Sequence, residues 1–149
     1  MTTAIPPTLQ PAAAQSLATW HRMVAQHDLS DLPALLHPEA QFRSPMAFKP
    51  YPGAGAVALI LNTVLNVFEG FTYHREFASA DGLNVVLEFS ASVAGRQLKG
   101  VDLIRFDEAG LIVEFEVMIR PASGLQALGE AMGQRLAVAL PALLGARPG

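Results

Sequence analysis

The feature that most constrains the fold is a change of hydrophobic period at Gly70. Before this glycine, side chains that suit a core recur at helical spacing, as in the i, i+3, i+4, i+7 series Leu17, Trp20, His21 and Val24. After it, apolar and polar residues alternate, which is typical of strands with one buried face. Helices followed by an antiparallel run of strands predict an α+β fold, in which the helices cover one face of a curved antiparallel sheet.

Turn residues divide the chain into elements and parts. Asp81-Gly82, Gly95-Arg96 and residues 107–110 separate consecutive strands as tight turns. The expected elements are helices over about 12–27, 31–36 and 57–68, strands over 40–44, 71–80, 83–93, 97–106 and 111–120, and a last helix that begins near Ser123. We expect a flexible, proline-rich arm over residues 1–11, an α+β domain over 12–121, and a C-terminal helix and tail over 122–149.

Composition excludes several classes of function. The chain has 149 residues, which is the usual size of one domain, and 51% of them are hydrophobic. The 10 Lys and Arg against 13 Asp and Glu leave a net charge of −3, so we expect no nucleic-acid partner, which would require a basic face. The absence of Cys excludes disulfides, thiolate catalysis and Cys-based zinc sites.

Neither a cofactor nor a metal nor a membrane segment is expected. Gly53-Ala54-Gly55 lacks the later glycine and the preceding strand of a phosphate-binding loop, and the 4 His residues show no metal-site spacing. The longest apolar run, 136–146, is interrupted by Pro141 and has about half the length that spans a bilayer. Because residues 1–15 lack Lys, Arg and a continuous apolar core, we expect no signal peptide and a soluble, cytoplasmic protein.

One acidic residue, Asp102, breaks the alternation of the strand over 97–106. Its face otherwise carries Leu98, Gly100, Ile104 and Phe106. Burying a bare carboxylate costs several kcal/mol, so Asp102 either has a partner or is protonated with a raised pKa. A neutral carboxylic acid in an apolar pocket can donate a hydrogen bond to a developing oxyanion. The alternatives are a carboxylate bonded to a local N–H group and a slip of register that turns Asp102 to solvent.

The same strand carries a family resemblance. Residues 101–110, Val-Asp-Leu-Ile-Arg-Phe-Asp-Glu-Ala-Gly, are similar to the penultimate strand and turn of ketosteroid isomerases, and residues 20–45 follow their first two helices and first strand. Over about residues 12–120 the chain resembles the nuclear-transport-factor-2-like superfamily, which includes SnoaL-like polyketide cyclases and ketosteroid isomerases. The resemblance implies a cystatin-like, cone-shaped α+β barrel with a pocket at its open end. It also implies a homodimer formed through the outer sheet face.

The resemblance assigns roles residue by residue. Ketosteroid isomerases use an Asp base, a Tyr donor and a protonated Asp donor. The protonated Asp matches Asp102, the Tyr position falls on Trp20, and the base position falls on Ser44. An indole N–H is far less acidic than a phenol, and Ser does not abstract a carbon-bound proton unaided. Ketosteroid isomerase activity is therefore not the leading hypothesis.

A replacement acid–base group has to come from another side chain, with His74 as the first candidate. SnoaL-like cyclases use pocket Asp and His groups, and a His74–Asp102 pair would resemble theirs. Phe71, Tyr73 and Phe77 favour the opposite face of that strand, so the alternative is a surface position for His74 and for Glu76, which shares its face. His21 is a further candidate, because it either reaches the pocket mouth or lies at the edge of the core. His37 is another, and its alternative role is to interact with the dipole at a helix C-terminus.

The remaining candidate ligand-binding side chains line either a cavity or a packed core. With Ser44, they are Trp20, Phe42, Phe89, Phe115 and Ile119. The outer face carries Glu88, Glu114 and Glu116, which can pair with Arg105 and Arg120 within the sheet or across a subunit interface. The last helix presents an apolar side for the cone mouth or for a partner subunit, formed by Leu125, Leu128, Met132, Leu136 and Leu140.

The leading hypothesis is a protein that binds a small, mostly apolar molecule in the cone, with Asp102 as its polar anchor. Isomerase-, cyclase- or hydrolase-type acid–base chemistry is compatible with such a site. The alternative is a non-catalytic ligand-binding or dimerisation module with a packed cone. A cavity of about 300 Å³ or more that reaches Asp102 would favour the first, and a cone filled by Trp20, Phe89 and Phe115 the second.

Overall fold

The computed structural model of the chain describes residues 5–143. The helices in this range are α1 (Pro11–Ala25), the 3-10 helix η1 (Leu32–Leu35), α2 (Ala54–Val67) and α3 (Ala122–Leu143). The strands are β1 (Leu36–Arg43), β2 (Tyr51–Pro52), β3 (Glu69–Ala78), β4 (Asn84–Val93), β5 (Arg96–Phe106) and β6 (Ile112–Arg120). The predicted change from helices to strands near Gly70 is confirmed.

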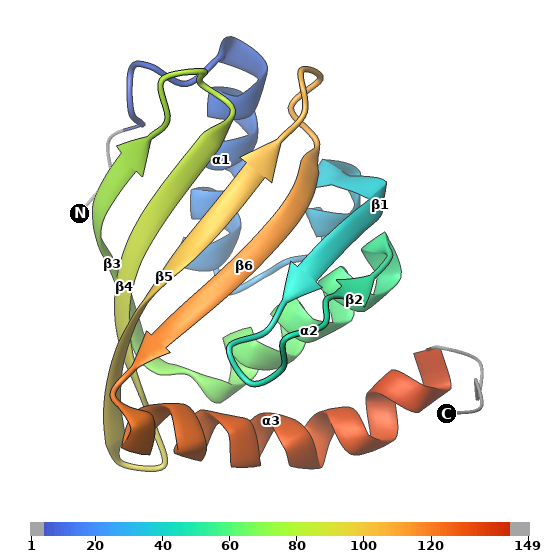
Figure 1. Cartoon of the computed structure of the whole chain (residues 1–149), viewed down its shortest axis with the longest axis vertical. Helices are drawn as coiled ribbons and strands as arrows, with labels where there is room; N and C mark the ends of the chain where they lie inside the picture. The colour runs from blue at the N-terminus through green and yellow to red at the C-terminus, as the bar shows by residue number, and fades with distance from the viewer. Residues whose placement is uncertain (1–4, 144–149) are drawn as a thin grey trace.

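One curved sheet, in the strand order β2-β1-β6-β5-β4-β3, forms the frame of the molecule. It curves around α1 and α2, while α3 runs across the end at which β6 finishes (Figure 1). The predicted α+β class, with helices on the concave face, is confirmed. The sheet differs from the expected antiparallel barrel in two respects, because β1 pairs in parallel with β6 and because β2 and β3 remain as open edges.

The boundaries of the helices and strands differ most from the predicted ones around Pro38. The expected helix over 31–36 is reduced to η1, and β1 begins at Leu36 instead of Ala40. Pro38 therefore lies inside a strand, at a point where the register with β6 shifts between Leu36 and Gln41. Proline has no N–H to donate to a ladder, so it is tolerated at such an irregularity. The two-residue strand β2 has no periodicity and was not predicted.

The segment that was expected to be a flexible arm is packed in its described part. Leu9 belongs to the core, and the Gln10 N–H donates to the Gly82 carbonyl oxygen at 3.0 Å. Gly82 has a φ of +73°, and a Cβ there would meet the Thr8 carbonyl oxygen at 2.6 Å. This close approach docks the chain before α1 onto the β3–β4 turn. Residues 1–4 of the predicted arm lie outside the described residues.

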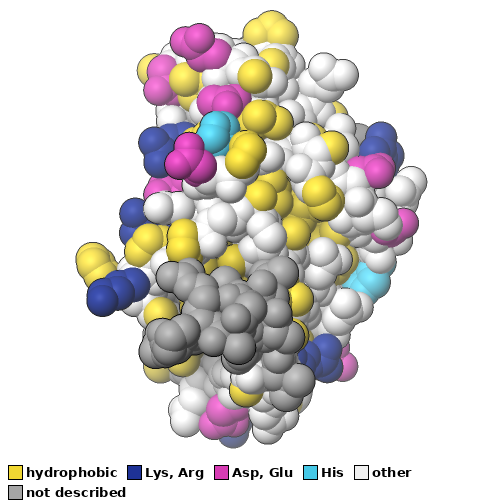
Figure 2. All heavy atoms as spheres, turned by 90° about the vertical axis from the view of Figure 1, so that its right-hand side faces the viewer, with side chains coloured by type: hydrophobic (Ala, Val, Ile, Leu, Met, Phe, Trp, Pro, Cys, Tyr) yellow, Lys and Arg dark blue, Asp and Glu magenta, His cyan; other side chains and the backbone are white. Residues whose placement is uncertain are grey.

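Two hydrophobic clusters fill the space between the sheet and the helices. The larger lies between the sheet, α1 and α2, and includes Leu17, Met23 and Phe115. The smaller lies between the sheet and the first half of α3 and includes Phe89 and Leu128. Figure 2 shows that uncharged and hydrophobic side chains occupy most of the described surface on the side of the molecule where α3 ends. Within residues 5–143, no helix combines the length and the apolar character that crossing a bilayer requires.

Candidate functional site

Asp102 lies on the buried face of β5, as the alternation predicts. Residues 98, 100, 102, 104 and 106 are all buried, whereas Lys99 and Arg105 are exposed. Only 5% of Asp102 is accessible, and its neighbours in register are Leu87 on β4 and Val117 on β6. The carboxyl group is therefore surrounded by apolar strands on both sides and directed at the helices.

A phenol supplies the hydrogen-bond partner of this carboxyl group. The Tyr73 hydroxyl, on β3, donates to Asp102 Oδ2 at 2.5 Å. The Trp20 indole N–H, on α1, donates to the Tyr73 hydroxyl oxygen at 3.0 Å. Three distant elements thus form one directed chain of hydrogen bonds, from Trp20 through Tyr73 to Asp102. Among the described residues, the other carboxyl oxygen of Asp102, Oδ1, has no hydrogen-bond partner.

The Tyr73 ring is held in place by edge-to-face contacts with Phe71, His21 and, at 6.5 Å, Phe89. The Phe71 ring lies 4.8 Å from it at 88°, and the His21 ring lies 5.2 Å from it at 85°. A β-bulge orients β3 at this point, since three residue steps from Tyr73 to Glu76 oppose the two steps from Phe89 to Leu87 on β4. The extra residue brings both Tyr73 and Glu76 to the inner face.

Because of this bulge, the side chains of β3 after Tyr73 face the opposite way from the prediction. The Glu76 side chain is 3% exposed, and its Oε1 lies 2.8 Å from His21 Nε2. His74 is exposed and bonds to Ser90 Oγ at 2.7 Å, while Phe77 is 53% exposed. The prediction that His74 and Glu76 share a face, opposite to Phe77, is wrong because a bulge reverses the alternation. The structure does not bring His74 and Asp102 together.

The environment of the carboxyl group changes its acidity. Burial raises the pKa of Asp102 to about 7, although the hydrogen bond from Tyr73 lowers it in part. Burial, followed by the charge of Asp102 and the hydrogen bond to it, holds the pKa of Tyr73 well above its ordinary value of 10.0. Near neutral pH, Asp102 therefore exists in both protonation states, and Tyr73 stays a neutral hydrogen-bond donor.

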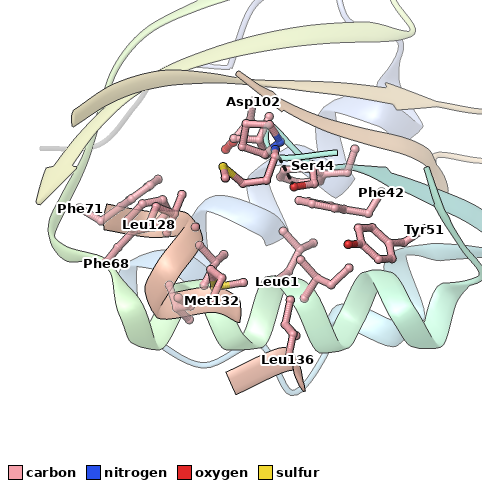
Figure 3. A pocket seen from close by; sticks show the side chains of 18 of the residues that line it. Phe42, Ser44, Tyr51, Leu61, Phe68, Phe71, Asp102, Leu128, Met132 and Leu136 are labelled. Atoms are coloured by element: carbon pink, nitrogen blue, oxygen red, sulfur yellow. Dashed lines mark hydrogen bonds between the residues drawn. The ribbon is translucent and has the colours of Figure 1, made fainter. Parts of the chain in front are cut away.

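A cavity of about 210 Å³ reaches Asp102. Figure 3 shows Asp102 and Phe42 on the strand side of this cavity and Leu128, Met132 and Leu136 of α3 among the side chains that line it. The volume is below the roughly 300 Å³ at which drug-sized ligand sites begin. The cavity therefore does not reach the size that the sequence analysis set for a ligand site, although Trp20 and Phe115 leave space beside Asp102 instead of filling it.

The candidate ligand-binding side chains divide into two groups. Trp20, Phe42, Ser44 and Phe115 line the cavity, as predicted. Phe89 and Ile119 instead belong to the second hydrophobic cluster, where the Phe89 ring stacks on Phe71 at 5.0 Å. Both face inward, but they pack within this cluster and are not among the described lining residues of the cavity.

Leu128, Met132 and Leu136 of α3 line the cavity, which agrees with the cone mouth, one of the two positions predicted for the last helix. The other lining residues were not identified from the sequence as ligand-binding candidates. They are Val24, Leu29, Pro45, Met46, Tyr51, Ile60, Leu61, Val64, Leu65, Phe68, Phe71, Tyr73, Val117, Gly129 and Gly133. Tyr73 is the most important of these. Its alternation with Phe71 indicated an inward side chain, but no sequence signal indicated the acceptor of its hydroxyl group. The side chain of Leu140, also expected on this side of α3, lies outside the described residues.

The chain matches the SnoaL-like domain over residues 17–115. This protein belongs to the SnoaL-like domain family. The predicted membership of the nuclear-transport-factor-2-like superfamily is therefore confirmed. No curated protein matches the chain.

Solved structures similar to this SnoaL-like protein include a steroid delta-isomerase from Pseudomonas aeruginosa. It is 65% identical, with a TM-score of 0.88, over 92% of this chain and 98% of its own. An uncharacterized protein with a cystatin-like fold from Silicibacter pomeroyi is 36% identical, with a TM-score of 0.79, and the match covers 87% of this chain and 90% of that protein. SalBIII, an epoxide hydrolase/cyclase-like enzyme with a role in pyran ring formation in salinomycin, is 18% identical, with a TM-score of 0.60, over 74% and 91%. At that identity SalBIII shows the fold alone.

The roles carried over from ketosteroid isomerases are only partly reproduced in the SnoaL-like protein. Ser44 lines the cavity, but its Oγ accepts the Met46 N–H at 3.0 Å and so stabilises a turn. Trp20 donates to Tyr73 rather than to Asp102. Within the described lining, Asp102 is the only carboxyl group, and the lining contains no Lys, Arg or His. Asp102 is therefore the one acidic side chain of the described lining.

Proposed function

We propose that this SnoaL-like protein binds a small, uncharged, mostly apolar molecule that carries one oxygen, and that Asp102 transfers protons to and from it. The observation that carries the proposal is the arrangement of the Asp102 carboxyl group. Its Oδ2 accepts from Tyr73, whereas Oδ1 has no partner among the described residues and the side chain lines the cavity. The name of the 65% identical Pseudomonas aeruginosa structure, a steroid delta-isomerase, supports acid–base chemistry of this kind.

The arrangement supports a balanced sequence of two proton transfers. Because Oδ2 already accepts a hydrogen bond, the proton of neutral Asp102 resides on Oδ1, and the O–H bond breaks as the proton moves to a ligand carbonyl oxygen. The new carboxylate is stabilised by the Tyr73 hydroxyl group. It then removes a proton from the carbon next to the carbonyl, and the C–H electrons form the C=C bond of an enol. Reversal at a second carbon completes an isomerisation with Asp102 unchanged, and a pKa near neutrality suits both directions.

Hydrogen–deuterium exchange tests this chemistry directly. The protein is incubated in D₂O with cyclohexanone and cyclohex-2-enone, and deuterium on carbon is measured by mass spectrometry. We expect faster incorporation with the wild-type protein than in buffer, and loss of this acceleration in Asp102→Asn. Asp31→Asn, which changes an exposed carboxylate near Arg22, is the matched control and should behave as the wild type.

The outcomes separate the two functions considered. Binding without incorporation would replace the enzymatic proposal by that of a ligand-binding module. The absence of both binding and incorporation across a panel of uncharged ketones, enones and epoxides would contradict the proposed function altogether.

A further inference from the structure

We propose that the ligand of this site is the size of one six-membered ring with small substituents, and that α3 imposes this limit. The inference rests on the proposed function and adds to it the class of molecule. It also distinguishes this chain from what the name of the Pseudomonas aeruginosa structure suggests, because a steroid contains four fused rings.

Cavity volume is the first argument. A hydrophobic cavity of about 150 Å³ holds benzene, and sites for drug-sized ligands begin at roughly 300 Å³. The cavity beside Asp102, at about 210 Å³, lies between these values. Scaled from benzene, it therefore accommodates a guest of about seven to nine non-hydrogen atoms.

The chemistry of the lining is the second argument. Apart from Asp102, the polar side chains of the described lining are Ser44, Tyr51, Tyr73 and the Trp20 indole, all of which are uncharged. A carboxylate or phosphate ligand would find no cation there, and an unpaired buried charge is strongly unfavourable. A neutral molecule with one oxygen near Asp102 matches this distribution.

The position of α3 is the third argument. α3 lies beyond the matched domain, which ends at residue 115, yet it supplies part of the cavity wall. Leu128, Met132 and Leu136, spaced by four residues, present one face of α3 to the cavity. At Gly129 an added Cβ would meet the Met46 side chain at 2.6 Å, so the helix already touches the loop that follows β1. Where α3 forms the wall, a larger guest thus requires either displacement of α3 or shortening of its side chains.

Tryptophan fluorescence measures occupancy of the cavity without knowledge of the natural ligand. Trp20 is the only tryptophan in the chain and lines the cavity. The probes are cyclohexanone, the two-ring ketone 1-decalone and the four-ring enone androst-4-ene-3,17-dione. We expect the wild-type signal to respond to the first and to show no saturable response to the last.

Variants of α3 test whether this helix sets the limit. Met132→Ala with Leu136→Ala enlarges the cavity, and we expect it to improve the affinity for 1-decalone by about tenfold, equivalent to ~1.4 kcal/mol. Leu125→Ala removes a half-buried leucine of the same helix outside the described lining, and should leave all affinities unchanged. Circular dichroism of each variant confirms that the fold is retained.

The results distinguish the inference from the proposed function. Saturable binding of the four-ring enone to the wild-type protein, weakened by Asp102→Asn, would overturn the size limit and leave the proposed function intact. Unchanged 1-decalone affinity in the folded double variant would overturn the role of α3. A wild-type protein that binds none of the three ketones would contradict the proposed function itself.

Discussion

Asp102 and Glu88 have similarly low solvent accessibility, but Asp102 lies on the inner face of the sheet and Glu88 lies on the outer face, below the exposed side chains of Arg75 and Lys99. Asp102 is 5% exposed and Glu88 6%, and they lie on neighbouring strands, where Leu87 is opposite Asp102 and Glu88 opposite Val101. On the outer face, Glu88 accepts two hydrogen bonds from Arg75, at 2.8 and 2.7 Å, and lies 2.9 Å from Lys99 Nζ. On the inner face, Asp102 has only the neutral Tyr73 hydroxyl.

The pKa values of the two carboxyl groups are shifted in opposite directions. Hydrogen bonds from Arg75 and Lys99 hold the pKa of Glu88 well below its usual range, because they favour the charged carboxylate. Burial without a cation raises the pKa of Asp102 to about 7. Similarly low accessibility therefore accompanies a structural ion cluster in one case and a group that exchanges protons near neutrality in the other. The depth of the carboxyl group and the charge of its neighbours together decide which of the two it becomes.

The largest expected effect is on the pH dependence of stability, which Asp102→Asn should remove. The unfolded carboxyl ionises near its ordinary pKa of 3.8, and the folded one near 7. Between these values the native state binds more protons than the unfolded state, so the free energy of unfolding falls as pH rises through this window and is constant above it. The difference between the two pKa values corresponds to a change of roughly 4 kcal/mol in the free energy of unfolding across this window.

Urea unfolding at a series of pH values measures this effect as the difference between wild type and variant. Asp31→Asn serves as the control and should retain the wild-type dependence. Parallel curves for the wild type and Asp102→Asn would show that the carboxyl group titrates normally.

A smaller effect is expected from Tyr73→Phe, which removes the one partner of Asp102. The Trp20 N–H and Asp102 Oδ2 both lose their hydrogen bond, so the free energy of unfolding should fall by about 1–3 kcal/mol. Because this bond favours the charged carboxylate, the pKa of Asp102 should rise above about 7. Carbon-detected NMR of the Asp102 carboxyl group measures the shift. A pKa that falls in the variant would contradict the hydrogen bond.

The smallest effect is expected from Glu88→Gln on the outer face. Arg75 and Lys99 are 69% and 49% exposed, so they return to water when the carboxylate is removed, and the destabilisation should be less than that of Tyr73→Phe. It should be fully present above the ordinary pKa of 4.5, be lost progressively as pH falls from that value towards the much lower pKa of folded Glu88, and decrease at high salt. Thermal unfolding at two salt concentrations measures it. Independence of both pH and salt would exclude the ion cluster as its cause.

Local periodicity was sufficient for the features that depend on neighbouring residues in the chain. The alternation on β5 places Asp102 inward because successive side chains of a strand point to opposite faces. It fails on β3, where the bulge between Tyr73 and Glu76 inserts one residue without any change of composition. The alternation up to Tyr73 favoured the exposed position that His74 has, and the His74–Asp102 pair was predicted from the family resemblance alone. The bulge is the reason that the inward position of Glu76, and with it the His21–Glu76 pair, was not predicted.

The sequence by itself determined the α+β class, the family, and the burial of an acid on β5, since each depends on local pattern or on a continuous stretch of similar residues. The tertiary structure alone decided which side chains meet. Trp20, Tyr73 and Asp102 come from three elements far apart in the chain, and Phe115 lines the cavity while Phe89 is packed. Cavity size and the position of α3 depend on how side chains fill space, and periodicity carries no information about volume.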